Sequence, residues 1–186
     1  MKKKSLEMRL QEIPPLAHPN VSLEQYSTPA NIGADVLFEA FTRGDVEGRD
    51  VLDLGCGNGM FAIGAALLRS RTSVGVDLDL SALIQARKNA NGLGADVDFV
   101  RGDARRFSAK ADTVIMNPPF GAQNRGADLP FLLTGMSVAD AVYSIHMAET
   151  EEFLSRKVRD TGFRIDFQKR YKFEIPHMFA FHTKMK

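Results

Sequence analysis

The sequence lacks tryptophan and has three tyrosines and a single cysteine, Cys56, among its 186 residues. One cysteine excludes an internal disulfide, which agrees with a reducing compartment, so we expect a cytoplasmic protein. No apolar run approaches the roughly 20 residues that span a bilayer, and none follows the basic start Met1–Lys4, so neither a membrane partner nor an export signal is predicted. Cys56 and the four histidines show no metal-ligand spacing, so we predict no metal site.

An excess of charge of either sign is also missing, because 24 Lys and Arg are balanced by 23 Asp and Glu. The balance is uneven along the chain: residues 155–186 hold nine basic and three acidic side chains. A basic end suits a phosphate-binding surface, but a solvated strand edge protected by lysines would have the same composition. Charge alone leaves both interpretations open.

From Asp50 onward, apolar runs of strand type alternate with helical patterns. The strand-type runs are 50–54, 72–76, 97–100, 112–116 and 140–145, and the helical patterns are 59–69, 80–91, 127–137 and 149–161. This alternation predicts an α/β fold of Rossmann-like type, with a mainly parallel central sheet and helices on both faces. The aromatic stretch 163–183 predicts an antiparallel C-terminal hairpin at the sheet edge. We expect a single domain over 1–186, with 1–22 as an N-terminal extension.

A glycine-rich turn, DLGCGNG over 53–59, joins the first strand to the helix that follows. Glycines let a backbone turn tightly and approach a ligand closely. A dinucleotide pyrophosphate prefers the spacing G-x-G-x-x-G, whereas this turn has G-x-G-x-G after an acidic residue. The pattern resembles motif I of class I methyltransferases, and the Asp53 carboxylate suits the cationic methionine half of S-adenosylmethionine as cofactor.

Acidic residues also follow the next two strands. Asp77 comes directly after the second run, where this fold uses a carboxylate to accept hydrogen bonds from both ribose hydroxyls. Asp79 precedes a helical pattern, so we expect it to be the N-cap. Asp103 follows the third strand, where class I methyltransferases place an acid against the adenine amine, although a plain turn residue would also fit there.

The fourth strand ends in Asn117-Pro118-Pro119-Phe120. Prolines lack the N–H that a strand ladder needs, so the strand stops and its carbonyls stay free. The Asn117 side-chain carbonyl and the Pro118 backbone carbonyl could hold both hydrogens of an exocyclic amine and direct its lone pair at a sulfonium methyl. Phe120 would stack on the unstacked base. We predict these four residues as catalytic for nitrogen methylation, a motif that serves adenine N6, guanine N2 and glutamine amides.

Together these motifs resemble the small-subunit ribosomal RNA N6-adenosine methyltransferase family shared by archaea and eukaryotes. The matching segments are EQYSTP (24–29), DLGCGNG (53–59), VGVDLD (74–79), DTVIMNPPFG (112–121) with 124–132, and AVYSIH (141–146). The resemblance implies methylation of an RNA adenosine. It also implies a cofactor pocket lined by Gln25, Thr28, Gly55, Asn58, Met60, Asp77, Asp103 and Ala104. In eukaryotes the family binds a small zinc-containing activator by extending its sheet, which makes such a subunit a candidate partner beside RNA.

Other functions fit parts of the pattern. N5-glutamine methylation of a protein would need a docking surface that is not basic and usually an N-terminal helical domain, for which the about twenty residues before Gln25 are too few. Guanine-N2 methylation of RNA would use the same Asn-Pro-Pro motif. The non-enzyme alternative is a binding module that has lost catalysis, but such proteins usually lose the motif I glycines or the Asn-Pro-Pro sequence, and this chain keeps both.

Overall fold

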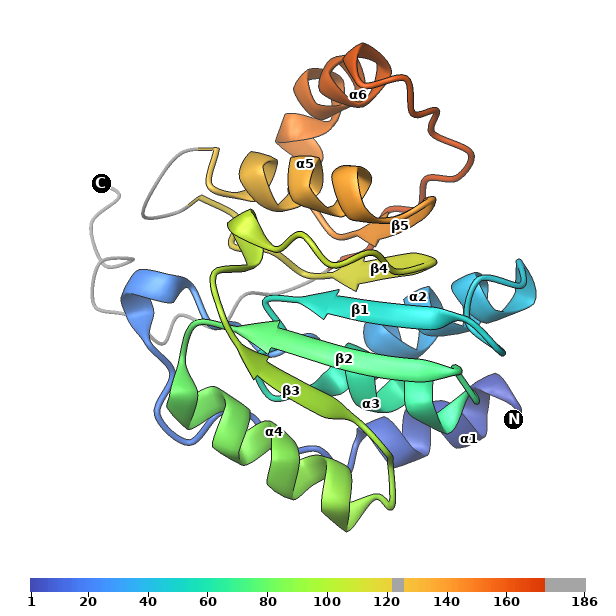
Figure 1. The fold of residues 1–186 in the computed structure, drawn as a ribbon, viewed down its shortest axis with the longest axis vertical. Helices are drawn as coiled ribbons and strands as arrows, with labels where there is room; N and C mark the ends of the chain where they lie inside the picture. Colours follow the sequence, from blue (N-terminus) through green and yellow to red (C-terminus); the bar gives the residue numbers. More distant parts are fainter. Residues whose placement is uncertain (122–125, 173–186) are drawn as a thin grey trace.

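The computed structural model describes residues 1–121 and 126–172, and its centre is a five-stranded sheet (Figure 1). The strands are β1 (Asp50–Leu54), β2 (Thr72–Asp77), β3 (Asp98–Arg101), β4 (Thr113–Met116) and β5 (Ala141–Ser144). The helices are α1 (Lys3–Leu10), α2 (Ala30–Thr42), α3 (Met60–Leu67), α4 (Leu80–Gly92), α5 (Asp128–Val138) and α6 (Glu151–Asp160), with short 3-10 helices η1 (Val21–Leu23), η2 (Ala104–Arg106) and η3 (Ala148–Thr150). The predicted α/β fold is confirmed.

The strand order is β3-β2-β1-β4-β5, and all four pairings are parallel. The chain therefore builds outward from β1 in one direction through β2 and β3, and in the other through β4 and β5. Between β1 and β4 lies the switch point of the sheet, and open α/β sheets bind ligands outside the carboxyl ends of their strands at this point. The topology thus indicates where a site belongs before any side chain is considered.

Alternation along the strands divides the core into two layers. Val51 of β1 belongs to a cluster with α1, α2, α3 and the end of α4, whereas its neighbours Leu52 and Leu54 belong to a cluster with α5 and α6. Burial on both faces explains why the strands are near-continuous apolar runs. In the described ranges, no helix is long and apolar enough to cross a membrane.

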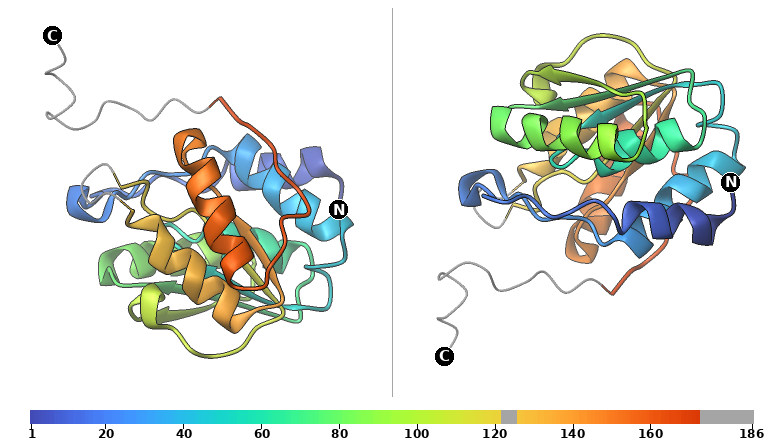
Figure 2. Two further views of the ribbon diagram at one scale, coloured as in Figure 1. Left: turned by 90° about the horizontal axis from the view of Figure 1, so that it is seen from above. Right: turned by 90° about the horizontal axis from the view of Figure 1, so that it is seen from below.

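Residues 1–22, predicted as an N-terminal extension, include helix α1, which packs beside α2 (Figure 2). Its Leu6 and Leu10 are fully buried in the first core layer. The start of the chain therefore contributes to the core of the sheet domain. The assignment of one domain to the whole of 1–186 stays a prediction.

The C-terminal segment differs from the hairpin that its aromatic pattern predicts. Residues 163–172 form no strand, and the rest of the expected hairpin, 173–183, lies outside the described residues. The described part returns to α2 instead. There Lys169 Nζ lies 2.5 Å from Asp35 Oδ2, and the Tyr171 hydroxyl donates to the same carboxylate over 2.6 Å. Side-chain contacts with a helix thus hold this segment in place of a strand ladder.

These contacts also bear on the basic end of the chain. Besides the Lys169–Asp35 pair, Arg170 Nη2 lies 2.8 Å from Glu151 Oε2. Arg156, Lys157 and Arg164 are paired with acidic residues as well, so five cations of this end already have a partner in the protein, whereas Lys172 is exposed. A phosphate-binding surface here would have to compete with these ion pairs.

Asp35 gives a first testable prediction, because Lys3 of α1 also pairs with it. Burial opposes its ionisation, but the hydrogen bonds from Lys169, Lys3 and Tyr171 outweigh burial and lower the pKa of Asp35 to about 2. A carboxylate with a lowered pKa stabilises the fold above about pH 4, and this contribution is lost as the pH falls toward the folded-state value. We expect Asp35→Asn to lower the free energy of unfolding by about 1 kcal/mol at pH 7 and by much less near pH 2.

Urea unfolding followed by circular dichroism measures this difference across the pH range. Glu39→Gln is the matched control, since Glu39 pairs with Arg43 on the surface of the same helix. Its effect should stay at about 0.3–0.5 kcal/mol. An Asp35→Asn penalty of equal size at pH 7 and pH 2 would contradict the role of the carboxylate charge.

Candidate active site

A cavity of about 400 Å³ opens at the switch point, a volume typical of small-molecule sites. Its walls come from residues 22–28, the turn after β1, the ends of β2 and β4, the segment at η2 and the start of α5. Eight of the nine predicted cofactor residues line it: Gln25, Thr28, Gly55, Asn58, Met60, Asp77, Asp103 and Ala104. Asn117 and Pro119 of the predicted catalytic motif line the same cavity. Residues from five distant parts of the sequence therefore meet as expected, and their roles stay predictions.

The turn after β1 owes its shape to three glycines in left-handed conformation. Gly55, Gly57 and Gly59 have φ values of +77°, +51° and +86°, which other residues rarely adopt. The backbone N–H of Gly55 donates to the carbonyl of Val76 over 2.8 Å, which holds the turn against the end of β2. A Cβ on Gly55 would also lie 3.1 Å from the ring of Phe131, so the cavity wall tolerates no side chain there.

Asp77 stands at the end of β2 with its carboxylate oriented by backbone groups. Its Oδ2 accepts from Gly57 N–H over 2.8 Å, and its Oδ1 accepts from Asp79 N–H over 2.9 Å. The residue is 8% exposed. Burial raises the pKa of Asp77 with help from the Asp79 charge, although the backbone hydrogen bonds oppose this. The result is a rigid acceptor that borders the cavity and has lone pairs left for donors of a ligand.

Asp79 is the N-cap of α4, as predicted, because its side chain accepts from Ser81 N–H over 2.8 Å. Its other oxygen accepts from the Gln25 side-chain amide over 3.0 Å. Asp79 thus fastens the N-terminal segment next to Asp77, while Asp77 faces the cavity.

Asp103 has a partner that the sequence interpretation missed. Arg105 makes a bidentate pair with it, with Nε–Oδ1 and Nη2–Oδ2 distances of 2.8 and 2.7 Å. This hydrogen-bonded pair lowers the pKa of Asp103. Arg105 also lines the cavity, so a ligand that binds Asp103 must share the carboxylate with the guanidinium. The sequence could have indicated this pair, because Arg105 follows Asp103 by two residues.

Asp53, Pro118 and Phe120 are the predicted site residues that do not line the cavity. Pro118 and Phe120 lie in the same loop as Asn117 and Pro119, which do. Asp53 requires a correction, because it is 1% exposed and its Oδ2 accepts from Ala62 N–H of α3 over 3.0 Å. Burial, reinforced by the charge of Asp77, raises the pKa of Asp53 to about 8 against the effect of the Ala62 hydrogen bond. In this place the carboxyl of Asp53 holds α3 inside the core and does not line the cavity.

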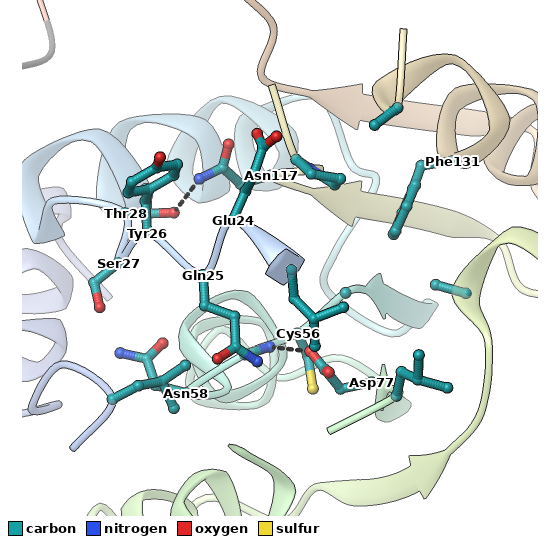
Figure 3. A pocket seen from close by; sticks show the side chains of 18 of the residues that line it. Glu24, Gln25, Tyr26, Ser27, Thr28, Cys56, Asn58, Asp77, Asn117 and Phe131 are labelled. Atoms are coloured by element: carbon teal, nitrogen blue, oxygen red, sulfur yellow. Dashed lines mark hydrogen bonds between the residues drawn. The ribbon is translucent and has the colours of Figure 1, made fainter. Parts of the chain in front are cut away.

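Asn117 follows β4, and only one end of its side-chain amide has a hydrogen-bond partner among the described residues. Its Nδ2 donates to Thr28 Oγ1 over 3.0 Å (Figure 3). Its Oδ1 is buried and has no hydrogen-bond partner within 1–121 and 126–172. A buried carbonyl left without a donor costs free energy, and such atoms in native proteins usually have a reason. Because Asn117 lines the cavity, this atom is a candidate acceptor for a ligand N–H.

Glu24 is a further site residue that the sequence interpretation passed over, although it begins the segment EQYSTP. It is 6% exposed and has a φ of +50°, a conformation that is uncommon outside glycine. Its Oε2 accepts from Gly121 N–H over 2.9 Å, directly after the Asn-Pro-Pro-Phe sequence. The N-terminal segment is therefore bonded to the loop after β4 as well as to Asp79.

Comparison with known proteins defines the class of this fold and cavity. The family model described as methyltransferase small domain matches residues 26–132. A solved structure from Pyrococcus horikoshii superposes with a TM-score of 0.85 at 38% identity, covering 89% of this chain and 84% of that one. The protein is a methyltransferase of the α/β, class I type.

Two relatives match almost the whole chain. The rRNA N(6)-adenosine-methyltransferase METTL5 of Danio rerio is 37% identical over 192 residues, which cover 99% of this chain and 93% of that protein. A protein of Methanocaldococcus jannaschii is 36% identical over 196 residues, covering 99% of this chain and 89% of its own. The chain belongs to the family of rRNA N6-adenosine methyltransferases and their archaeal relatives, as its motifs predict.

Proposed function

We propose that this protein transfers a methyl group from S-adenosylmethionine to the N6 amine of an adenosine in RNA, with small-subunit ribosomal RNA as the substrate. The observation that carries the proposal is the Oδ1 of Asn117, which is buried, lies in a residue that lines the cavity and has no hydrogen-bond partner among residues 1–121 and 126–172. An exocyclic amine has hydrogens to donate to this atom. The similarity to a fish rRNA N(6)-adenosine-methyltransferase over nearly the full length supports adenosine as the base.

The cavity residues fit the cofactor. Asp77 presents two fixed carboxylate oxygens that suit neighbouring ribose hydroxyls, and the turn around Gly55 gives a close approach of backbone to ligand. Asp103 and Ala104 would face the adenine ring, and Gln25, Asn58 and Met60 would surround the rest. When bound, the cofactor supplies an electrophilic methyl group on sulfur.

The chain's own part in the reaction is to hold the amine and stabilise its charge. The adenine amine is a poor nucleophile because its lone pair is delocalised into the ring. Asn117 Oδ1 and the Pro118 carbonyl would accept its two hydrogens, which turns the nitrogen toward tetrahedral geometry and frees the lone pair for in-line attack. The same acceptors stabilise the positive charge that develops on nitrogen, so no strong general base is required. Phe120 would stack on the flipped-out base.

The test uses the purified full chain, S-adenosylmethionine with a deuterated methyl group, and transcribed small-subunit ribosomal RNA. Mass spectrometry of the digested nucleosides should show labelled N6-methyladenosine. Labelled N2-methylguanosine would support the guanine alternative, and labelled methylglutamine in an added ribosomal or release-factor protein would support the protein-substrate alternative. Cofactor binding without any transfer would indicate a binding module.

We also propose a small zinc-binding activator subunit as partner, docked at β3. This strand ends the described sheet on one side, and exposed apolar side chains lie on β3 itself and on the neighbouring segment that follows β2 into α4, which contacts β3: Val100, Leu78, Leu80 and Ile84. An unpaired edge beside apolar surface is suited to β-augmentation by a partner strand. The cytoplasmic location predicted from the single cysteine stays a prediction.

Coexpression with a candidate zinc-binding subunit tests the partner. The double variant Leu80→Glu/Ile84→Glu should abolish copurification, whereas Met8→Glu, an equally exposed change on α1, should leave it intact. Retained copurification of the double variant would exclude this surface.

A further inference from the structure

Thr28 lines the cavity and comes just before helix α2. It is 9% exposed and was predicted from the family resemblance to contact the cofactor. In the structure its side chain contacts the predicted catalytic motif: Thr28 Oγ1 accepts from Asn117 Nδ2 over 3.0 Å. The two residues are 89 positions apart in the sequence, so the contact depends on the fold.

The direction of this hydrogen bond matters because the two ends of an asparagine amide have nearly the same shape and opposite chemistry. One end accepts and the other carries two N–H donors. If the amide of Asn117 were turned by half a rotation, its NH2 group would face the amine of the target base, and two donors would oppose each other. In the structure Thr28 Oγ1 accepts from Nδ2, which leaves Oδ1, a buried atom without a partner among the described residues, as the free acceptor. Because a hydroxyl can also donate, this hydrogen bond anchors the amide in place without excluding the turned form.

We infer that Thr28 is a positioning residue that anchors the Asn117 amide through its hydroxyl, so that the amide carbonyl is held where it can accept from the target amine. The inference rests on the proposed function. The hydrogen bond from Gly121 N–H to Glu24 Oε2 supports it, because the same N-terminal segment holds the catalytic loop at both ends of the motif. The same segment also contacts the residues that follow β2, because the Gln25 side-chain amide donates to Asp79, next to the predicted cofactor residue Asp77.

The kinetic test compares Thr28→Val, which keeps the shape but removes the hydroxyl, with Thr28→Ser, which keeps the hydroxyl. Thr28→Val should lower kcat by about tenfold, as expected for one lost hydrogen bond at the reacting centre, while KM and Kd for S-adenosylmethionine change less than twofold. Thr28→Ser should retain nearly full turnover. A weakened cofactor affinity in Thr28→Val would instead assign Thr28 to the cofactor and overturn the inference.

A double-mutant cycle separates positioning from a merely structural role. If Thr28 acts through Asn117, the double variant Thr28→Val/Asn117→Ala should be no slower than Asn117→Ala alone in single-turnover assays. A structural defect would multiply with the loss of Asn117, and such a multiplied loss overturns the inference.

A spectroscopic measurement decides the matter independently of methyl transfer. The side-chain NH2 resonances of Asn117, identified by their absence in Asn117→Ala, should shift and exchange faster in Thr28→Val and remain near their wild-type positions in Thr28→Ser. Unchanged resonances in Thr28→Val overturn the inference even if the enzyme is active. If the wild type methylates no RNA adenosine, the proposed function fails, while these resonances still show whether Thr28 orients Asn117.

Discussion

Replacing Asn117 by alanine is expected to lower turnover at least roughly a hundredfold while the affinity for S-adenosylmethionine stays nearly unchanged. Removal of one preorganised acceptor from a reacting centre typically has an effect of this size, because the interaction strengthens as charge develops in the transition state. The structure adds that the lost oxygen is already buried and unpartnered among the described residues, so the site holds an acceptor ready for a donor.

Single-turnover methylation of ribosomal RNA and calorimetric cofactor titration measure the two quantities separately. Asn91→Ala is a suitable control, because Asn91 is an exposed asparagine near the end of α4 and does not line the cavity. Turnover and cofactor affinity that fell together in Asn117→Ala would show that Asn117 binds the cofactor or supports the fold instead.

The second large effect is expected at Asp77. Asp77→Ala should weaken S-adenosylmethionine binding by about 2–3 kcal/mol, because a carboxylate that accepts from two ribose hydroxyls makes charge-assisted hydrogen bonds. The raised pKa of Asp77 adds a pH dependence: cofactor affinity should fall on acidification through this pKa, at a higher pH than for an ordinary aspartate. This dependence should be absent in the variant.

Two controls are needed for Asp77→Ala, because the substitution also leaves the N–H groups of Gly57 and Asp79 without their acceptor. A thermal melt checks that the variant is folded. Asp79→Asn removes a neighbouring charge but keeps a good helix cap, and its cofactor affinity should change little. Equal affinity of folded Asp77→Ala and wild type would exclude the ribose assignment.

Local patterns in the sequence were sufficient to predict the strand ends and the helix cap that surround the site. The run at 50–54 coincides with β1, and prolines after Asn117 mark the end of β4, because an apolar run and a missing N–H determine strand limits locally. The cap at Asp79 is equally local. The carboxyl ends of parallel strands share one edge of the sheet, so the motifs that follow them had to meet there.

Asp53 shows why a residue next to a motif can be misjudged. Its place beside the glycine turn favours a ligand contact, but strand alternation sets it between Leu52 and Leu54 and therefore on the opposite face from them. That face is covered by α3, where Asp53 accepts from Ala62 N–H and burial raises the pKa of its carboxyl. Whether a strand carboxylate is charged depends on what covers it, and this is a tertiary property.

Long-range side-chain contacts could not be predicted from sequence patterns either, because they also depend on the tertiary structure. The bond between Glu24 and Gly121 joins residues 97 positions apart. The stretch 163–172 has a strand-like aromatic pattern, yet its Lys169 and Tyr171 bind Asp35 of α2. Neither partner can be identified until the fold brings the elements together.

The carboxylate of Asp35 has a consequence for how the chain matures on the ribosome. It receives Lys3 from the beginning of the chain and Lys169 and Tyr171 from near its end, so its full set of partners exists only after residue 171 has been synthesised. Helices α1 and α2 can dock early with the Lys3–Asp35 pair in place, but the contacts from Lys169 and Tyr171 are missing throughout translation of the sheet. These contacts must therefore form after the sheet has been synthesised, and a nascent chain that stops before Lys169 lacks both of these partners of Asp35 at α2.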